Sequence, residues 1–370
     1  MGIGRFAFTP ILPMMQEDAG VSIVAGAWLA SANYVGYLLG ALSVMVVPIR
    51  PTHAIRGGLV AIAFATLGMG VQHHFAVWIV LRALAGIASA WVLVCTSAWC
   101  LERLAPLRRP VLESTVFAGV GAGIALAGAA CLALMRLHTA SARAWIVFGI
   151  VSLLVAVVVW PVFGTGDRAT VSARRWADTR LAWDGEWLRL TLCYGAYGFG
   201  YIIPATFLPV MARQAIADPA AFGLAWPLFG AAAMASTLLV SGVRRFVTNR
   251  RLWIASHLVM ALGVALPVIR PGITATMLAA LCVGGTFMVI TMVGMQEARD
   301  VAGTRATALM AAMTSAFALG QIVGPIIASY LHGVDGDFSA ALLVTCGALV
   351  VSALGLSYPS VSRGGLHGVS

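Results

Sequence analysis

The residues of this chain that could carry chemistry are charged side chains placed inside long apolar segments. Arg5 lies in the apolar stretch Gly2–Met15, and Arg82 lies in another apolar stretch, at 75–101. A charged side chain at the centre of a bilayer costs about 2.5–3.5 kcal/mol even on the most lenient scale, so it is expected to face protein or a wet cavity. No carboxylate lies at a comparable depth to neutralise Arg5, which favours an anionic ligand. A structural arginine bound by neighbouring helices is the alternative.

Uncharged polar residues are the second group of candidates. Polar groups in apolar helices often bridge helices, so each could serve packing or could line a central cavity. For Tyr197 and Tyr201 we favour cavity lining, because their segment repeats the one that holds Arg5. The expected substrate-binding or cavity set is Arg5, Tyr201, Tyr197, Asn33, Tyr37 and Gln321.

Two acidic residues and Arg82 are candidates for coupling or gating. Glu113 falls in the first turn of an expected helix, where a carboxylate also suits the helix dipole, and this capping role is the alternative. Glu297 stands beside Arg299 and Asp300 and near Arg305, which favours a salt-bridge cluster over a proton-carrying role. For Arg82, helix packing is the alternative to coupling.

Four prolines interrupt the segments that hold Arg5 and Tyr201. Proline removes a backbone donor and bends a helix, and in lipid such breaks persist only where protein or a cavity satisfies the freed carbonyls. We therefore expect helix kinks that act as flexing points at Pro10, Pro13, Pro204 and Pro209.

The composition excludes a water-soluble globule. Of the 370 residues 61% are hydrophobic and 10% are charged, and the mean hydropathy is +0.94. This is the composition of an integral membrane protein. The net charge of +10 comes from arginines in short loops without an aromatic-rich basic face, so a nucleic-acid partner is not expected. His73 and His74 have no further ligands nearby, and we expect neither a metal nor a cofactor.

Segments long enough to cross the ~30 Å hydrocarbon core recur along the whole chain. The hydropathy pattern predicts an all-α protein with twelve transmembrane helices in two pseudo-symmetric six-helix bundles. We expect an N-terminal half at 1–163, a cytoplasmic linker at 164–186, a C-terminal half at 187–358 and a cytoplasmic tail at 359–370. The predicted spans cover 1–16, 21–47, 55–72, 75–101, 111–136, 143–163, 187–212, 221–243, 252–270, 273–296, 305–331 and 338–358.

The loop arginines predict the orientation of these spans. If the N-terminus is cytoplasmic, most loop arginines fall on the cytoplasmic side, and the outer loops hold only Arg136, Arg143, Arg213 and Arg270. This asymmetry satisfies the positive-inside rule and predicts that both termini are cytoplasmic.

The start of the chain has an internal repeat. The residues Gly2, Gly4, Leu12, Pro13 and Met15 recur in register as Gly198, Gly200, Leu208, Pro209 and Met211, with Tyr201 in the place of Arg5. The later copy is preceded by about 16 Å of further helix, Trp187–Tyr197, at 1.5 Å per residue. We therefore expect the first helix to be truncated here, with a true start upstream of Met1 that would put Arg5 near the middle of the bilayer.

These motifs support a family resemblance. The stretches Gly2–Pro10, Gly36–Gly40 and Gly198–Phe207 resemble the YbfB/YjiJ-type members of the major facilitator superfamily. The resemblance implies two six-helix halves and a transport function with an undefined substrate. Arg82–Gly86 is similar to the superfamily's Arg-x-x-x-Gly element, whose arginine is associated with ion coupling.

One superfamily motif departs from the pattern. The loop between the second and third spans lacks the expected aspartate and reads Pro48–Gly57. The gate that this aspartate would help to close must be held differently, and the candidate acids are Glu102, Glu113 and Glu297.

Together these features predict a secondary transporter of the bacterial inner membrane that moves a small organic solute by alternating access. An anionic solute is favoured, and the substrate, the direction and a role for protons stay open. A multidrug exporter is the alternative. A membrane-embedded sensor or enzyme is a remote one, because no nucleophile with its base and no large soluble segment is present. We expect a protein without enzyme activity that lies in the lipid bilayer and works as a monomer.

Overall fold

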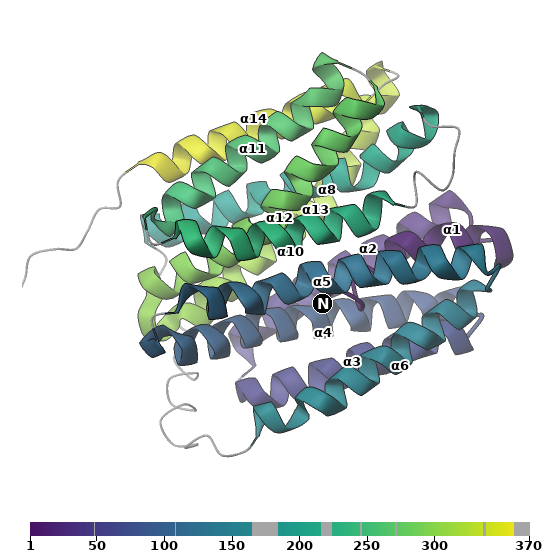
Figure 1. The fold of residues 1–370 in the computed structure, drawn as a ribbon, viewed down its shortest axis with the longest axis horizontal. Coiled ribbons are helices and arrows are strands. Elements are labelled where there is room, and N and C mark those ends of the chain that lie inside the picture. Colours follow the sequence, from purple (N-terminus) through teal and green to yellow (C-terminus); the bar gives the residue numbers. More distant parts are fainter. Residues whose placement is uncertain are drawn as a thin grey trace, which may run out of the picture.

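A computed structural model describes residues 1–47, 49–107, 109–164, 184–215, 224–244, 246–270, 272–335 and 338–358. Side chains are described within these ranges except at 206–215, 273 and 332–335. Within the described ranges all regular secondary structure is helical (Figure 1). The α-helices are α1 Phe8–Asp18, α2 Ile23–Val46, α3 Pro51–Val71, α4 Phe75–Leu104, α5 Pro110–Arg136, α6 Ser141–Val159, α8 Gly185–Ala215, α10 Ala225–Val243, α11 Asn249–Ile269, α12 Ile273–Ala302, α13 Ala306–Asp335 and α14 Ser339–Ser357.

The helices pack in two groups that repeat one pattern. Among the N-terminal helices (α1–α6), α4 packs against α2 and α3, and α3 packs against α6. Among the C-terminal helices (α8–α14), α12 packs against α10 and α11, and α11 packs against α14. In Figure 1 the N-terminal helices, purple to teal, lie below the C-terminal helices, green to yellow. The order of helix partners is therefore the same in the two groups.

Two helix pairs make most of the contact between the groups, α5 with α10 and α2 with α13, and smaller contacts join α4 and α5 to α12 and α4 to α13. Figure 1 shows α5 and α10 side by side at the boundary. Glycine permits this approach, because a Cβ built on Gly230 of α10 would lie 2.2 Å from the Ala125 backbone nitrogen of α5. Likewise a Cβ on Gly121 of α5 would lie 2.5 Å from the Met234 nitrogen. The two backbones thus touch where no side chain fits between them.

The outward faces of the helices are apolar, as expected in lipid. Nine segments of the described chain are long and apolar enough to cross a membrane, with α12 and α13 counted as one continuous segment. Large side chains point outward along them, among them Ile23 at 80% and Val158 at 76% exposure. Because these surfaces would be costly in water, the fold agrees with the predicted membrane protein.

Several details differ from the sequence-based expectations. The third helix begins at Pro51 and not at residue 55, because proline is favoured in the first turn, where its missing N–H breaks no helical bond. Residues 2–7 form turns before α1, in which the Arg5 nitrogen donates to the Met1 carbonyl at 3.2 Å. Pro10 lies in the first turn of α1, and Pro13 lies inside that helix.

Other predicted features fall partly or wholly outside the described residues. Pro204 and Pro209 lie within α8, and the Pro209 side chain is among those that are not described. Most of the predicted linker, at 165–183, and the predicted tail, at 359–370, lie outside the described ranges.

Candidate functional site

Arg5 lies at the junction of the two helix groups. Its side chain is 6% exposed, and its Nη2 donates a hydrogen bond of 2.6 Å to Oε1 of Gln321 on α13. The guanidinium carbon lies 3.8 Å from the centre of the Tyr37 ring on α2. Among the described residues no carboxylate pairs with Arg5, and its buried Nε has no hydrogen-bond partner. The predicted residues Arg5, Gln321 and Tyr37 are therefore in direct contact, and the cation keeps an unused donor.

The close packing of α2 on α4 positions Tyr37 and Asn33. A Cβ on Gly36 would lie 2.1 Å from the Ala83 carbonyl oxygen, and one on Gly86 would lie 2.2 Å from that of Asn33. Both Tyr37 and Asn33 are fully buried. The Asn33 amide donates to the Arg82 carbonyl at 2.9 Å, while its Oδ1 and the Tyr37 hydroxyl have no partner. Two buried polar atoms of α2 thus remain unsatisfied, one of them on the side chain that contacts Arg5, which is unusual in a buried site.

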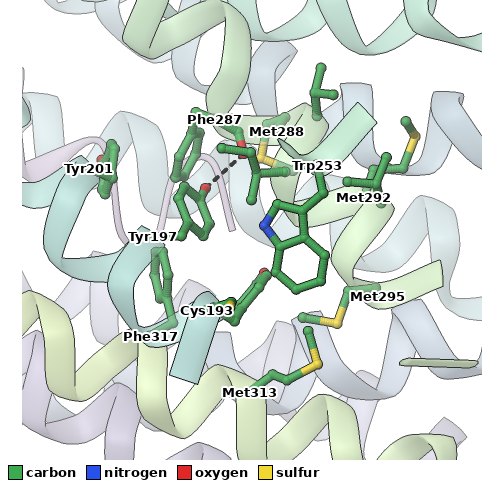
Figure 2. Close-up of a cluster of buried hydrophobic side chains, with 14 of the residues drawn as sticks. Cys193, Tyr197, Tyr201, Trp253, Phe287, Met288, Met292, Met295, Met313 and Phe317 are labelled. Atoms are coloured by element: carbon green, nitrogen blue, oxygen red, sulfur yellow. Dashed lines mark hydrogen bonds between the residues drawn. The ribbon is translucent and has the colours of Figure 1, made fainter. Parts of the chain in front are cut away.

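Aromatic rings from both helix groups surround this point. We call Tyr37, Tyr197, Tyr201, Phe229, Phe287 and Phe317 the aromatic cluster. Tyr201 stacks on Phe287 with ring centres 4.4 Å apart, and Tyr197 lies 4.9 Å from Phe317. In Figure 2, Tyr197, Tyr201 and Phe317 lie to the left of the buried core, and Met292 and Met295 lie to the right, beyond Trp253.

The two α8 tyrosines differ in what their hydroxyls contact. The Tyr197 hydroxyl donates to the Phe287 carbonyl at 2.7 Å and lies 3.1 Å from Oγ1 of Thr291. The bond to Phe287 is the dashed line in Figure 2. This satisfied hydroxyl matches the packing alternative for Tyr197. Tyr201 contacts its neighbours mainly through ring faces, and it stacks on Phe287, the ring against which Phe6 packs from the start of the chain.

Arg82 is held by backbone carbonyls. Its Nε donates to Leu29 at 3.4 Å and its Nη1 to Gly4 at 3.3 Å, and the guanidinium lies over the Phe8 ring at 4.4 Å. It is 3% exposed. The Arg82 side chain thus joins α4 to α2 and to the turn that carries Arg5, and it positions that turn.

Glu113 joins the two helix groups at one end of the bundle. It lies in the first turn of α5 and is 6% exposed. Its Oε2 accepts from Arg244 Nη1 and from Gln296 Nε2, each at 2.9 Å, and its Oε1 accepts from Arg299 Nη1 at 3.3 Å. We call these four residues the Glu113 cluster. The single carboxylate of an N-terminal helix thus binds three donors from the C-terminal helices, in addition to lying at a helix N-terminus.

The predicted cluster around Glu297 is divided between several contacts, which corrects the sequence-based expectation. Glu297 pairs with Arg250 at 2.9 Å, and Arg250 also contacts Glu186. Arg299 pairs with Asp300 at 2.8 Å and turns toward Glu113. Arg305 lies over the Trp187 ring at 5.4 Å. Glu297 and Arg299 are two residues apart on α12 and therefore point in different directions, so they belong to different clusters.

Three residues in these networks were not singled out from the sequence. Arg244 and Gln296 complete the Glu113 cluster, and the signal available for Gln296 is the same as for Gln321, an amide in an apolar helix. His257 is fully buried. Its Nε2 accepts from Trp253 Nε1 at 3.3 Å, and its Nδ1 lies 3.4 Å from the Ser352 hydroxyl. A histidine four residues after a tryptophan inside a span was the signal for that pair.

Comparison with known proteins identifies the class. Residues 1–356 match a family model described as "Uncharacterised MFS-type transporter YbfB". The chain is a transporter of the major facilitator type and not an enzyme. Within that class it belongs to the YbfB family.

Two solved structures have a similar fold. The human organic anion transporter MFSD10 (TETRAN) has a TM-score of 0.66 at 16% identity, with 95% of this chain and 89% of that chain covered. The Escherichia coli fucose:proton symporter FucP, solved as a variant, has a TM-score of 0.67 at 11% identity, with 96% and 94% covered. At such low identity the likeness concerns the fold. A search of curated protein sequences finds no match.

Proposed function

We propose that this protein is a secondary transporter for a small organic anion, with Arg5 at the centre of the substrate site. The observation that carries the proposal is a buried cation in contact with both helix groups and paired with no carboxylate in the described chain. A buried charge without a counter-charge is costly, and a bound anion would supply one. One protein of similar fold, MFSD10, is an organic anion transporter, which is consistent with this cargo.

Alternating access supplies the mechanism of the proposal. We take the chain as twelve spans in two halves, 1–163 and 187–358, which move against each other as bundles around Arg5. The repeated packing order of the two helix groups supports this division. Arg5 and Gln321 come from different halves, so the rocking motion would make and break their contact and alter the donors offered to a substrate.

The Glu113 cluster is proposed as the gate at one end, in place of the aspartate that the loop at 48–57 lacks. It is buried and crosses between the halves, so opening that end must separate Glu113 from Arg244 and Arg299. From the loop arginines we take this end as cytoplasmic, with both termini inside, in the bacterial inner membrane. In this proposal Arg82 positions the turn that carries Arg5, and Glu297 stabilises the C-terminal half through its ion pair with Arg250. The prolines of α1 and α8 allow those helices to bend during the cycle. We expect the monomer to be the working unit.

Uptake into proteoliposomes tests the proposal. The protein is reconstituted with a radiolabelled organic acid pool, with and without a pH gradient, beside the variants Arg5→Gln and Arg270→Gln. Arg270 is an exposed arginine at the end of α11, so its variant controls for the loss of a positive charge. We expect flux that Arg5→Gln abolishes and Arg270→Gln retains. Flux of anions that is unchanged in Arg5→Gln would refute the assigned site, and gradient-independent flux would exclude obligatory proton coupling.

A multidrug exporter is the second candidate, and the aromatic cluster favours it because stacked rings accept varied apolar compounds. A deletion strain distinguishes the two. Loss of tolerance to structurally unrelated apolar cations would favour the exporter, since such compounds should be repelled by Arg5 in the first proposal. Unchanged tolerance together with Arg5-dependent anion flux would exclude it.

A further inference from the structure

We propose that the substrate is a flat aromatic monocarboxylate, whose carboxylate binds the Arg5 guanidinium and the Tyr37 hydroxyl and whose ring lies among the rings of the aromatic cluster. This inference rests on the proposed function and names the substrate class of that same site. Three observations carry it: the unused donors, the way in which Arg82 is already occupied, and the surroundings of the unused donors.

The unused donors define a site for a carboxylate head. Arg5 Nε and the Tyr37 hydroxyl are both buried without a partner, and the two side chains are in contact. Buried donors are almost always satisfied, so a contacting pair that is not satisfied points to a group that arrives from outside. A carboxylate has two oxygens that accept hydrogen bonds and a charge that strengthens them. A neutral carbonyl could use the donors but would leave the charge of Arg5 unbalanced.

The donors left near Arg5 favour a ligand with a single carboxylate. Arg82 is the other buried arginine nearby, but its Nε and Nη1 already donate to the carbonyls of Leu29 and Gly4 and its face is covered by Phe8. The unpartnered Nε of Arg5 is therefore the guanidinium donor left for a carboxylate. A dianion would leave one carboxylate in an apolar, desolvated place without a partner, and this is strongly unfavourable.

The surroundings favour an aromatic body. Next to Arg5, Phe6 packs edge-on against Phe287 at 5.7 Å, and Tyr201 lies stacked on the same ring. Trp226 stacks on Phe229 with an interplanar angle of 8°, and its indole nitrogen is a further buried donor without a partner. Rings that already stack in several orientations can exchange one partner for a planar ring, whereas a puckered saturated ring stacks poorly.

Binding to the purified full-length chain tests the inference. The probes are benzoate, its saturated analogue cyclohexanecarboxylate, the dianion phthalate and the cation benzylamine, each titrated by calorimetry and by thermal shift. We expect benzoate to bind, cyclohexanecarboxylate to bind about two- to tenfold more weakly, and phthalate and benzylamine to give no shift. Arg5→Gln should abolish benzoate binding, while Arg270→Gln should retain it.

Tyr37→Phe is the decisive variant, because it removes only an unpartnered hydroxyl. The ring that packs on Arg5 and on Phe317 remains, so the ligand-free protein should melt at the same temperature or higher. Benzoate affinity should fall about tenfold or more, since a hydrogen bond to a charged group is lost. If the role of Tyr37 were merely structural, Tyr37→Phe would bind each probe as wild type does.

Each of the other outcomes would contradict a specific part of the inference or of the proposed function. If cyclohexanecarboxylate equals benzoate, or phthalate binds more tightly, the aromatic monoanion is wrong, while Arg5-dependent binding would leave the proposed function standing. If benzoate binds Tyr37→Phe as tightly as wild type, the carboxylate site is wrong. If benzoate binds Arg5→Gln equally well, both the inference and the assigned substrate site are wrong. If no probe binds wild type, the inference is overturned, and the proteoliposome assay still decides whether anions are carried.

Discussion

At the scale of single residues, the two buried arginines show how the same residue type serves two purposes. Arg82 uses its donors on carbonyls of the chain, at 3.4 Å and 3.3 Å. Arg5 has one strong bond, to Gln321, and an aromatic face. Their sequence settings are equally apolar, so hydropathy could not separate the structural arginine from the candidate ligand-binding one. The difference lies in which backbone carbonyls the fold brings near each side chain.

Removal of the Glu113 charge should open one end of the molecule. In Glu113→Gln, Arg244 and Arg299 keep their charges in a mostly buried place, and loss of one partner of such a pair costs about 3 kcal/mol. We expect a lower melting temperature and increased labelling of a reporter, Ser114→Cys, by a thiol reagent. Ser114 is fully buried. The reporter is placed in a background in which the six native cysteines are replaced.

Glu297→Gln provides the matched control for that experiment. Its partner Arg250 belongs to the same helix group, so the substitution should lower the melting temperature without increasing the labelling of Ser114→Cys. Equal labelling in the two variants would mean that the Glu113 cluster is not a gate.

Tyr197→Phe should affect stability more than substrate binding. The variant loses the bond to the Phe287 carbonyl and the contact with Thr291, which corresponds to about 1 kcal/mol of stability. Calorimetric unfolding in detergent measures the stability, and organic-anion affinity measures the site. A large loss of affinity with unchanged unfolding would show instead that the Tyr197 hydroxyl binds substrate.

At the scale of the helices, the contact between α5 and α10 leaves no room for a methyl group. Gly230→Ala would bring a Cβ within 2.2 Å of the Ala125 nitrogen, so the two helices must separate, at a cost of about 1–3 kcal/mol or more. Gly285→Ala on α12 is the control, since nothing lies within 4 Å of its built Cβ, and alanine there should be neutral or stabilising by up to about 1 kcal/mol. Melting temperatures and transport rates of the pair test this, and equal effects would contradict the close approach.

The positions of the helices could be predicted from the sequence because the bilayer imposes their length. Which helices pack against one another could not be predicted in this way. The fourth and fifth predicted spans agree with α4 and α5 to within a few residues. The contact of Arg5 with Gln321 depends on how the two helix groups meet, and local pattern carries no information on that. The same holds for Arg244, whose role depends on α10 lying beside α5. The third helix begins at Pro51, before the predicted start at residue 55, because proline can occupy the first turn of a helix ahead of the apolar residues that mark the span.

At the scale of the whole molecule, the orientation can be tested at loops that the structure describes. We expect His73→Cys, between α3 and α4, to react with an impermeant thiol reagent in intact cells. Leu107→Cys, between α4 and α5, is exposed and should react only in inverted membrane vesicles, because its loop carries arginines. The reverse result would place the Glu113 cluster on the outer side and exchange the two ends of the proposed cycle.

The unpaired charge of Arg5 has an electrical consequence. If a monoanion neutralises it, the loaded carrier crosses its cycle without net charge, and the empty carrier returns with one positive charge near mid-membrane. An inside-negative membrane potential acts on a full elementary charge with about 2.3 kcal/mol per 100 mV, so it would pull the empty site inward and drive anions out. Proteoliposomes with an imposed potassium diffusion potential should therefore show voltage-dependent flux, and Arg5→Lys, which keeps the charge, should preserve the direction of that dependence.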